Sequence, residues 1–168
     1  MTGNPDSQSN EERESGEDQK ASGTSRQQRK DRLPAQRHRA RTLTLQSLYE
    51  ADQSGHDPVN SIERLIIDEQ AGNEAAEFAR GLVAGIKRSR AEIDNYISTA
   101  APQWPVEQLA VVDRNILRIA IYEMLIENET PMRVAVNEAV ELAKAFGSDA
   151  SPRFVNGVLG SLSAHKGG

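Results

Sequence analysis

The sequence contains no cysteine and has few aromatic residues. Without cysteine the chain has no disulfide framework and no thiolate chemistry. Aromatic residues make up only 4% of the sequence, with Trp104 as the single tryptophan. No apolar run approaches the roughly 18 residues of a membrane-spanning helix, and the N-terminus lacks the apolar core of a signal peptide. These absences predict a soluble, cytoplasmic protein without membrane contacts.

Motifs that carry catalysis or cofactor binding are also missing. His38, His56 and His165 lie far apart, and none has a second plausible metal ligand at helical spacing. The sequence has no glycine-rich phosphate loop and no nucleophile elbow. Strand-like alternation is absent too, which argues against the nucleotide-binding α/β folds. We therefore expect no enzymatic activity, no cofactor and no metal site.

Charge is distributed unevenly along the chain, although the net charge is only −5. Residues 26–41 hold seven bases and one acid, giving a local charge of +6 between two acidic stretches. Such a segment is typical of an anion-binding element on an acidic body. The bases are Arg26, Arg29, Lys30, Arg32, Arg37, Arg39 and Arg41.

Residues 1–33 predict a disordered tail, and residues 34–165 predict one folded domain. Up to residue 32 the tail has only Met1 and Ala21 as apolar residues, too few to offset the entropy of ordering. From Pro34 onward, helical periodicity predicts helices over residues 35–51, 58–69 and 74–99, a short turn over 106–110, and helices beginning near 112, 131 and 151. The predicted fold is all-α, with about seven helices in two packed sub-bundles joined around residues 100–105.

Local residue chemistry predicts where several helices begin and end. Asp57 and Ser151 each precede a proline and are expected to cap a helix, and Thr130 is expected to cap the helix that starts at Pro131. Gly147 is expected to end that helix in the left-handed conformation. Trp104 is expected to pack against its neighbours, since its large surface favours burial.

The arginines at the start of the first helix allow two interpretations. Arg37 and Arg41 lie four residues apart on one face, with Arg39 further round the helix. Cations are disfavoured at a helix N-terminus, so their presence requires an explanation. They are either solvated charges on an exposed turn or planar donors for phosphate groups.

Three linked segments near the C-terminus form a specific pattern. They are VDRNILRIAIYEML from residue 112, VAVNEAVELAKAFG from residue 134, and S-x-x-F-V-N-G-V-L from residue 151. Together they resemble the NusB family of bacterial transcription antitermination factors. The resemblance covers roughly residues 34–163. It implies pairing with ribosomal protein S10 (NusE), binding of single-stranded boxA RNA from ribosomal RNA leaders, and assembly with RNA polymerase and other Nus factors.

By the same resemblance, individual residues acquire expected roles. Arg37, Arg39 and Arg41 would hold RNA phosphates, with His38, Tyr49, Arg153 and Phe154 near the RNA and Asp113, Arg114 and Arg118 in the region that meets the protein partner. His38 departs from the family pattern, which often has arginine there, and an imidazole is mostly neutral at pH 7. Ala150 also departs, because relatives often carry an acid in this loop.

Two alternatives remain open at the level of the sequence. The chain could be a helical scaffold that binds only proteins and whose arginines contact no RNA. It could also be a detached accessory domain of a ribosomal RNA methyltransferase. A separate hypothesis is that the acidic half of the tail (Glu11, Glu12, Glu14, Glu17 and Asp18) competes with RNA for the basic half.

Overall fold

The computed structural model describes residues 2–3 and 14–166, with side chains described again from residue 25 onward. The chain divides into two compact units, with the boundary after Ala35. Glu11 and Glu12 lie outside the described residues, as do the side chains of Glu14, Glu17 and Asp18. The competition hypothesis for the acidic half of the tail therefore stays a prediction.

Helix α1 begins much earlier than the sequence predicted. It extends over Glu14–Ser54 and contains Pro34, whereas the prediction began at residue 35. A proline inside a helix removes one backbone donor, which is why it was taken to mark a boundary. Residues 25–35 are all exposed. That residues 1–33 lie outside the packed domain stays a prediction.

The remaining described elements are all helical. They are α2 (Pro58–Asp68), α3 (Asn73–Arg88), α4 (Arg90–Ala100), a 3₁₀ turn (Val106–Gln108), α5 (Val111–Ile121), a π-helical segment (Tyr122–Glu127), α6 (Met132–Phe146) and α7 (Ser151–Lys166). Residues 2–3 and 14–166 include no strand. The predicted all-α class and the number of helices are confirmed. None of the helices in these residues has the length and apolarity needed to cross a membrane.

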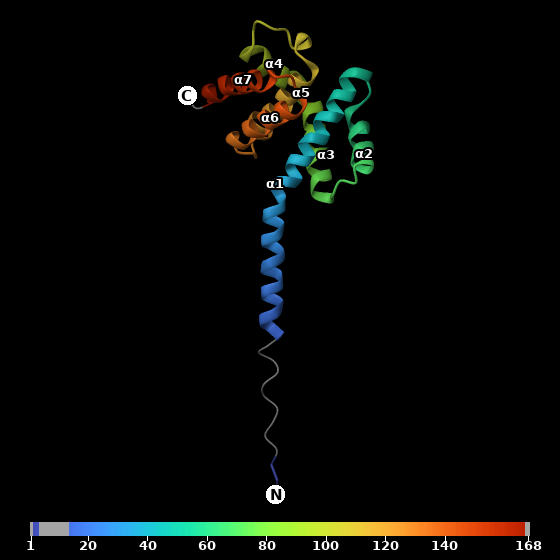
Figure 1. Ribbon diagram of the computed structural model, residues 1–168, viewed down its shortest axis with the longest axis vertical. Coiled ribbons are helices and arrows are strands. Elements are labelled where there is room, and N and C mark those ends of the chain that lie inside the picture. The colour runs from blue at the N-terminus through green and yellow to red at the C-terminus, as the bar shows by residue number, and fades with distance from the viewer. Residues whose placement is uncertain (1, 4–13, 167–168) are drawn as a thin grey trace. The chain divides into compact units, whose positions relative to one another are not determined.

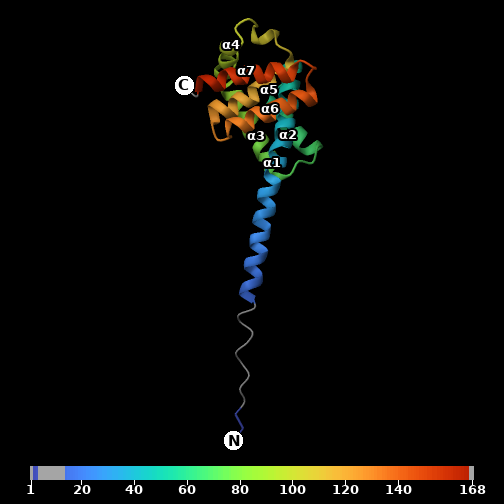
Figure 2. The ribbon, with the colours of Figure 1, turned by 60° about the vertical axis from the view of Figure 1, so that its left-hand side comes forward.

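Two hydrophobic clusters fill the second unit. The smaller joins α1, α2 and α3 through buried side chains that include Leu43, Ile62, Leu65 and Val83. The larger joins α4 to α7 with the inner faces of α1 and α3. Figures 1 and 2 show α5, α6 and α7 lying side by side in this part of the molecule. The predicted pair of sub-bundles is therefore present, with α1 and α3 contributing to both. The predicted junction around residues 100–105 was wrong, because Ile93 and Ile97 of α4 already belong to the larger cluster.

Helices α3 and α4 were predicted as one helix over residues 74–99. The structure separates them at Ser89, whose φ of −102° and ψ of 16° depart from helical values. The buried positions Ile86 and Ile93 lie seven residues apart, which matches two helical turns. Because this spacing continues the apolar period across the break, periodicity alone does not predict a division of the helix.

Of the predicted helix ends, the cap at Asp57 is confirmed, whereas the predictions for Thr130 and Gly147 were wrong. Asp57 caps α2 as predicted, and its carboxylate accepts a hydrogen bond from the Val59 amide at 3.0 Å. Thr130 does not cap α6, because its hydroxyl donates instead to the Glu123 carboxylate. Gly147 has a φ of −89°, so the predicted left-handed conformation was wrong. The left-handed residue is Asn128, with a φ of 59°, at the end of the π-helical segment.

Trp104 does not pack as predicted. Its side chain is 55% exposed in the loop between α4 and the 3₁₀ turn. The expectation relied on the size of the indole alone, whereas Trp104 lies in a non-helical segment between two prolines, Pro102 and Pro105.

Candidate nucleic-acid interface

Arg37 and Arg39 lie near the start of the second unit, where α1 is only partly covered. The guanidinium carbon of Arg37 lies 4.9 Å from the centroid of the Phe78 ring on α3, a cation–π contact. Among the described residues, none accepts a hydrogen bond from Arg37. Arg39 is exposed and donates to the backbone carbonyl of Glu69. Both guanidinium groups are therefore positioned by neighbours and still have N–H donors to offer a phosphate.

His38 lies between these arginines and is held by an acid on α6. Its Nδ1 atom is 2.7 Å from a carboxylate oxygen of Glu138, and half of its side chain is exposed. A protonated His38 would be partly neutralised by this carboxylate. His38 therefore offers a phosphate less attraction than the arginines on either side of it.

Arg41 does not belong to the exposed basic surface. Its side chain is 3% exposed and donates two hydrogen bonds to the Glu123 carboxylate, at 2.9 and 2.8 Å. A second acid, Glu138, lies 3.5 Å away. The prediction that Arg41 holds an RNA phosphate does not agree with this placement, because the guanidinium is covered and its charge is already paired. Arg41 instead joins α1 to the π-helical segment and α6.

The π-helical segment brings two acids close to arginines of α1: Glu123 pairs with Arg41, and Glu127 lies within electrostatic reach of Arg37. Burial raises the pKa of Glu127 above its ordinary value, and the negative charges of Glu129 and Glu123 raise it further. Arg37 opposes this shift through its positive charge. Segments of π-helix are rare and are often found at functional sites. Here the segment places Glu123 opposite Arg41 in the interior.

A cavity of about 290 Å³ lies beside Tyr49 and Asp113, at the junction of α1, α5 and the α6–α7 loop. Its lining also includes residues Ala110 to Val112, Phe146 to Ser148, and Ser151. Tyr49 is 42% exposed. Asp113 is nearly buried, and its Oδ1 atom has no hydrogen-bond partner among the described residues. A buried acceptor without a donor is costly, so this site is suited to a donor from another molecule.

The sequence model of the NusB family matches residues 38–164 of the chain. The chain belongs to the NusB family. A transcription antitermination protein NusB from Chloroflexus aggregans is 50% identical over 133 residues, which cover 78% of this chain and 89% of that protein. The corresponding protein of Dehalococcoides mccartyi is 46% identical over 131 residues, covering 78% and 92%.

Solved NusB structures share the fold. NusB of T. maritima aligns with a TM-score of 0.71 at 37% identity, over 76% of this chain and 90% of that one. A crystal structure of the antitermination factors NusB and NusE in complex with double-stranded RNA aligns with a TM-score of 0.72 at 26% identity, over 78% and 98%. The resemblance drawn from three sequence segments is thus confirmed at the level of the family.

In this NusB-family chain, Arg153 and Phe154 begin α7 next to the cavity-lining Ser151. Arg153 is exposed, whereas Phe154 is partly buried and packs against the larger hydrophobic cluster. The structure describes no contact between these two residues and Arg37, His38 or Arg39. Phe154 therefore has a packing role already, and its predicted place near RNA stays a prediction.

Arg114 and Arg118 were expected to face a protein partner, but both take part in an internal network. Arg118 is buried, and its guanidinium donates to Asp52 at 3.1 Å and to Asp94 at 2.9 Å. Arg114 donates to Asp52 at 3.0 Å. Burial alone would raise the pKa of Asp52, but hydrogen bonds from Asn115 and Arg114 and nearby positive charge hold it below its ordinary value. For Arg118 the predicted partner role does not agree with its burial. Of the three predicted partner residues, Asp113 alone has a buried polar atom without a hydrogen-bond partner among the described residues.

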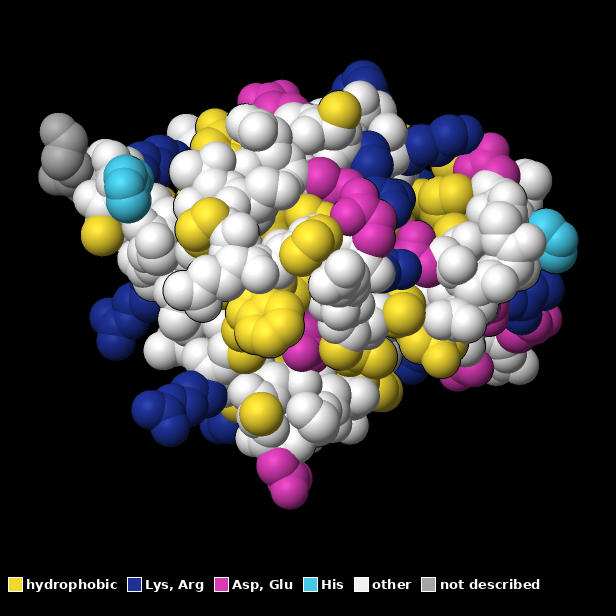
Figure 3. Space-filling view, turned by 90° about the horizontal axis from the view of Figure 1, so that it is seen from above, with side chains coloured by type: hydrophobic (Ala, Val, Ile, Leu, Met, Phe, Trp, Pro, Cys, Tyr) yellow, Lys and Arg dark blue, Asp and Glu magenta, His cyan; other side chains and the backbone are white. Residues whose placement is uncertain are grey.

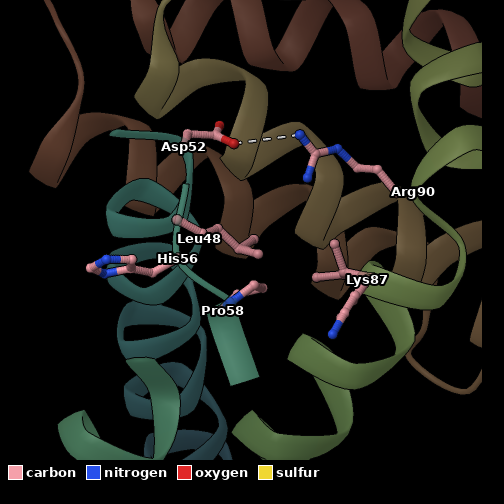
Figure 4. A pocket seen from close by; sticks show the side chains of 8 residues that line it. Leu48, Asp52, His56, Pro58, Lys87 and Arg90 are labelled. Carbon is pink, nitrogen blue, oxygen red and sulfur yellow. Dashed lines mark hydrogen bonds and ion pairs between the residues drawn. The ribbon is translucent and has the colours of Figure 1, made fainter. Parts of the chain in front are cut away.

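A second cavity of about 260 Å³ lies next to the same network in the NusB-family fold. Figure 4 shows Lys87 and Arg90 on one wall and His56 with Asp52 on the other. Its cations are already paired: Lys87 lies 2.8 Å from Asp57, and Arg90 lies 3.4 Å from Asp52. Both basic side chains are about half exposed, so they are solvated, but their pairing leaves little free charge at this site for RNA.

The top face of the NusB-family unit carries no concentrated positive charge. Figure 3 shows hydrophobic side chains near the middle of this face, with acidic and basic side chains interspersed around them. Nucleic-acid binding depends strongly on clustered cations. The part of α1 that opens the second unit, with Arg37 and Arg39, is therefore the better candidate for the RNA site.

Sequence reasoning missed three residues that position the predicted site residues. Phe78 contacts Arg37, Glu138 contacts His38, and Asp52 contacts Arg114 and Arg118. These contacts join different helices, so spacing along one helix does not reveal them. The pair Glu141–Lys144, by contrast, is local to α6 and lies at 3.2 Å.

Proposed function

We propose that the chain is an RNA-binding transcription antitermination factor that pairs with ribosomal protein S10 (NusE). In this proposal the pair binds single-stranded boxA-type RNA of ribosomal RNA leaders in the cytoplasm. The complex then joins RNA polymerase and other Nus factors and supports processive transcription. Membership of the NusB family supports this proposal, as does a solved relative containing NusB, NusE and RNA.

The observation that carries the RNA part of the proposal is the pair Arg37 and Arg39. Both lie on an accessible part of α1, and none of the described acids forms an ion pair with either. Guanidinium groups bind phosphates through two parallel hydrogen bonds and also stack on bases. Arg41 contributes by fixing the helix that presents them rather than by touching RNA.

Protein pairing is assigned to the cavity beside Asp113. The unpartnered Oδ1 atom of Asp113 would accept a hydrogen bond from a backbone N–H or a cation of S10. Tyr49 and Phe146 offer exposed aromatic surface at the rim, which suits protein contacts. Tyr49 lies twelve residues beyond Arg37, roughly 18 Å along α1 at 1.5 Å per residue. RNA and S10 would thus occupy neighbouring stretches of one helix.

Fluorescence anisotropy tests the RNA part directly. The substitution Arg37→Gln/Arg39→Gln should weaken binding of a boxA-like RNA in the presence of S10 and make the salt dependence shallower by about 1.4, since each single-strand phosphate contact contributes roughly 0.7. Arg64→Gln/Arg80→Gln is the matched control, because these two arginines are half-exposed on α2 and α3. The control should bind as the wild type does.

A helical scaffold that binds only proteins is the alternative. The cavity beside Asp113 favours it, since its exposed aromatic rim suits a protein partner without any RNA. If S10 binds but no RNA does, or if the double variant retains the wild-type salt slope, the scaffold interpretation replaces the proposed function.

A further inference from the structure

Residues 26–32 form a second basic surface that precedes the part of the chain matched by the NusB family. Their sequence, RQQRKDR, contains four cations and one acid, a local charge of +3. The family match begins only at residue 38. The family model therefore does not cover this segment.

Acids among the described side chains, from residue 25 onward, leave this charge without an ion pair. Residues 26–32 are helical and exposed, and the single acid, Asp31, accepts a hydrogen bond from Gln27 at 3.2 Å. Among the described residues, no acid forms an ion pair with Arg26, Arg29, Lys30 or Arg32. Arg26, Arg29 and Lys30 are spaced three and four apart, so they share one side of the helix. Like charges at this spacing repel one another, and a bound anion would relieve that repulsion.

The chemistry of the segment favours a polyanion over a protein surface. Between residues 25 and 35 the only large apolar side chain is Leu33, and it is 37% exposed. Without an apolar cluster, the segment has little surface to bury against a folded protein. Four clustered cations can instead neutralise successive phosphates and release their counterions.

We propose that residues 26–32 bind RNA phosphates outside the element held by Arg37 and Arg39. This inference rests on the proposed function. Arg32 lies five residues before Arg37, so their backbones are separated by between roughly 7.5 Å in a helix and 17 Å in an extended chain. For either geometry, the segment reaches RNA that continues beyond the boxA-like element. The chain would thus contact a longer stretch of RNA than Arg37 and Arg39 contact alone.

The expected effect is a difference in salt dependence between short and long RNA. Four additional phosphate contacts on a single strand should steepen the slope of log affinity against log salt by about 2.8. Between 50 and 200 mM salt, that slope corresponds to a further loss of roughly 50-fold in affinity for the longer RNA.

The experiment uses the full chain with S10 and three RNAs. One is a 12-nucleotide boxA-like RNA, and the other two carry an added 12-nucleotide uridine tract at the 5′ or the 3′ end. The test variant is Arg26→Gln/Arg29→Gln/Lys30→Gln/Arg32→Gln. The matched control, Arg26→Lys/Arg29→Lys/Arg32→Lys, keeps the charge. Because residues 25–35 are all exposed, the melting temperatures of both variants should equal that of the wild type.

For the wild type we expect one extended RNA to show the steeper slope. In the neutralised variant the short and extended RNAs should have equal slopes, and the lysine control should retain the difference. An unchanged length effect in the neutralised variant would overturn the inference, as would an equal loss for the short and extended RNAs. If the wild type fails to bind the 12-nucleotide RNA, the proposed function fails and this inference with it; if that RNA binds without a length effect, only this inference fails.

Discussion

Substitution of Arg41 by methionine should greatly lower the stability of the fold while leaving the number of phosphate contacts unchanged. Both Arg41 and Glu123 have side chains that are at most 3% exposed. Methionine keeps most of the apolar stem of Arg41 but removes both hydrogen bonds to Glu123. The carboxylate would then keep only the Thr130 hydroxyl, 3.0 Å away.

The size of the effect follows from the charge left behind. Removing one partner of a buried ion pair typically costs about 3–5 kcal/mol, because the other charge stays buried without compensation. Replacing both partners, as in Arg41→Met/Glu123→Leu, is often neutral or stabilising by roughly 1–4 kcal/mol. We therefore expect the double variant to be more stable than Arg41→Met alone.

Urea denaturation followed by far-ultraviolet circular dichroism measures these differences. Arg80→Met is the control, since Arg80 makes a similar two-bond pair with Glu63 while both side chains are nearly half exposed. It should lose far less stability than Arg41→Met, because solvent screens exposed pairs. The salt slope of RNA binding for folded Arg41→Met should equal that of the wild type. An Arg41→Met variant with wild-type stability and a shallower salt slope would refute the reasoning and would indicate that Arg41 contacts RNA.

Three further substitutions test the packing, the partner site and the internal network. Gly85→Ala should lower the melting temperature by several degrees, because an added Cβ would overlap the Tyr122 ring. The control is Gly81→Ala on the same helix, where an added Cβ meets nothing within 4 Å. This control should stabilise the protein by about 0.5–1 kcal/mol. Asp113→Ala should weaken S10 binding at least tenfold in a titration without destabilising the fold, because losing a helix-start charge is offset by removing a buried acceptor that has no donor. Retained S10 affinity would exclude Asp113 from the partner site. Asp52 has a pKa below its ordinary value, so its ionised form stabilises the fold at neutral pH and this contribution is lost as the pH falls below the unfolded value, near 3.8, towards the folded one. Asp52→Asn should therefore be less stable than the wild type at pH 7 in urea denaturation, and the difference should shrink on acidification.

Sequence periodicity correctly predicted the helices whose ends are determined by residues nearby in the chain. Helix α2 begins after Asp57 and ends within one residue of its prediction, because one capping carboxylate and one apolar stripe define it. The linked segments from residue 112 onward predicted the family, which the match over residues 38–164 confirms. Such features are contained in short stretches of sequence and need no knowledge of distant neighbours.

The positions of individual charged side chains could not be predicted in the same way. Arg118 was expected, from the family resemblance, in the region that meets the protein partner. Its burial depends on Asp52, 66 residues earlier in the chain, and on Asp94, 24 residues earlier. Arg41 likewise depends on Glu123, which the π-helical segment turns inward. Pairs that assemble from separate helices leave no spacing pattern in the sequence.

The central claim is that S10 and RNA bind this chain cooperatively, with the RNA recognised as a boxA-like single strand. The most direct measurement is the affinity for a boxA-like RNA, a scrambled RNA and a duplex of the boxA-like sequence, each with and without S10. We predict that S10 strengthens binding of the boxA-like single strand at least fivefold, within the usual range for coupled sites, and more than it strengthens the other two. Equal affinities for all three RNAs, or an affinity that S10 leaves unchanged, would contradict the claim.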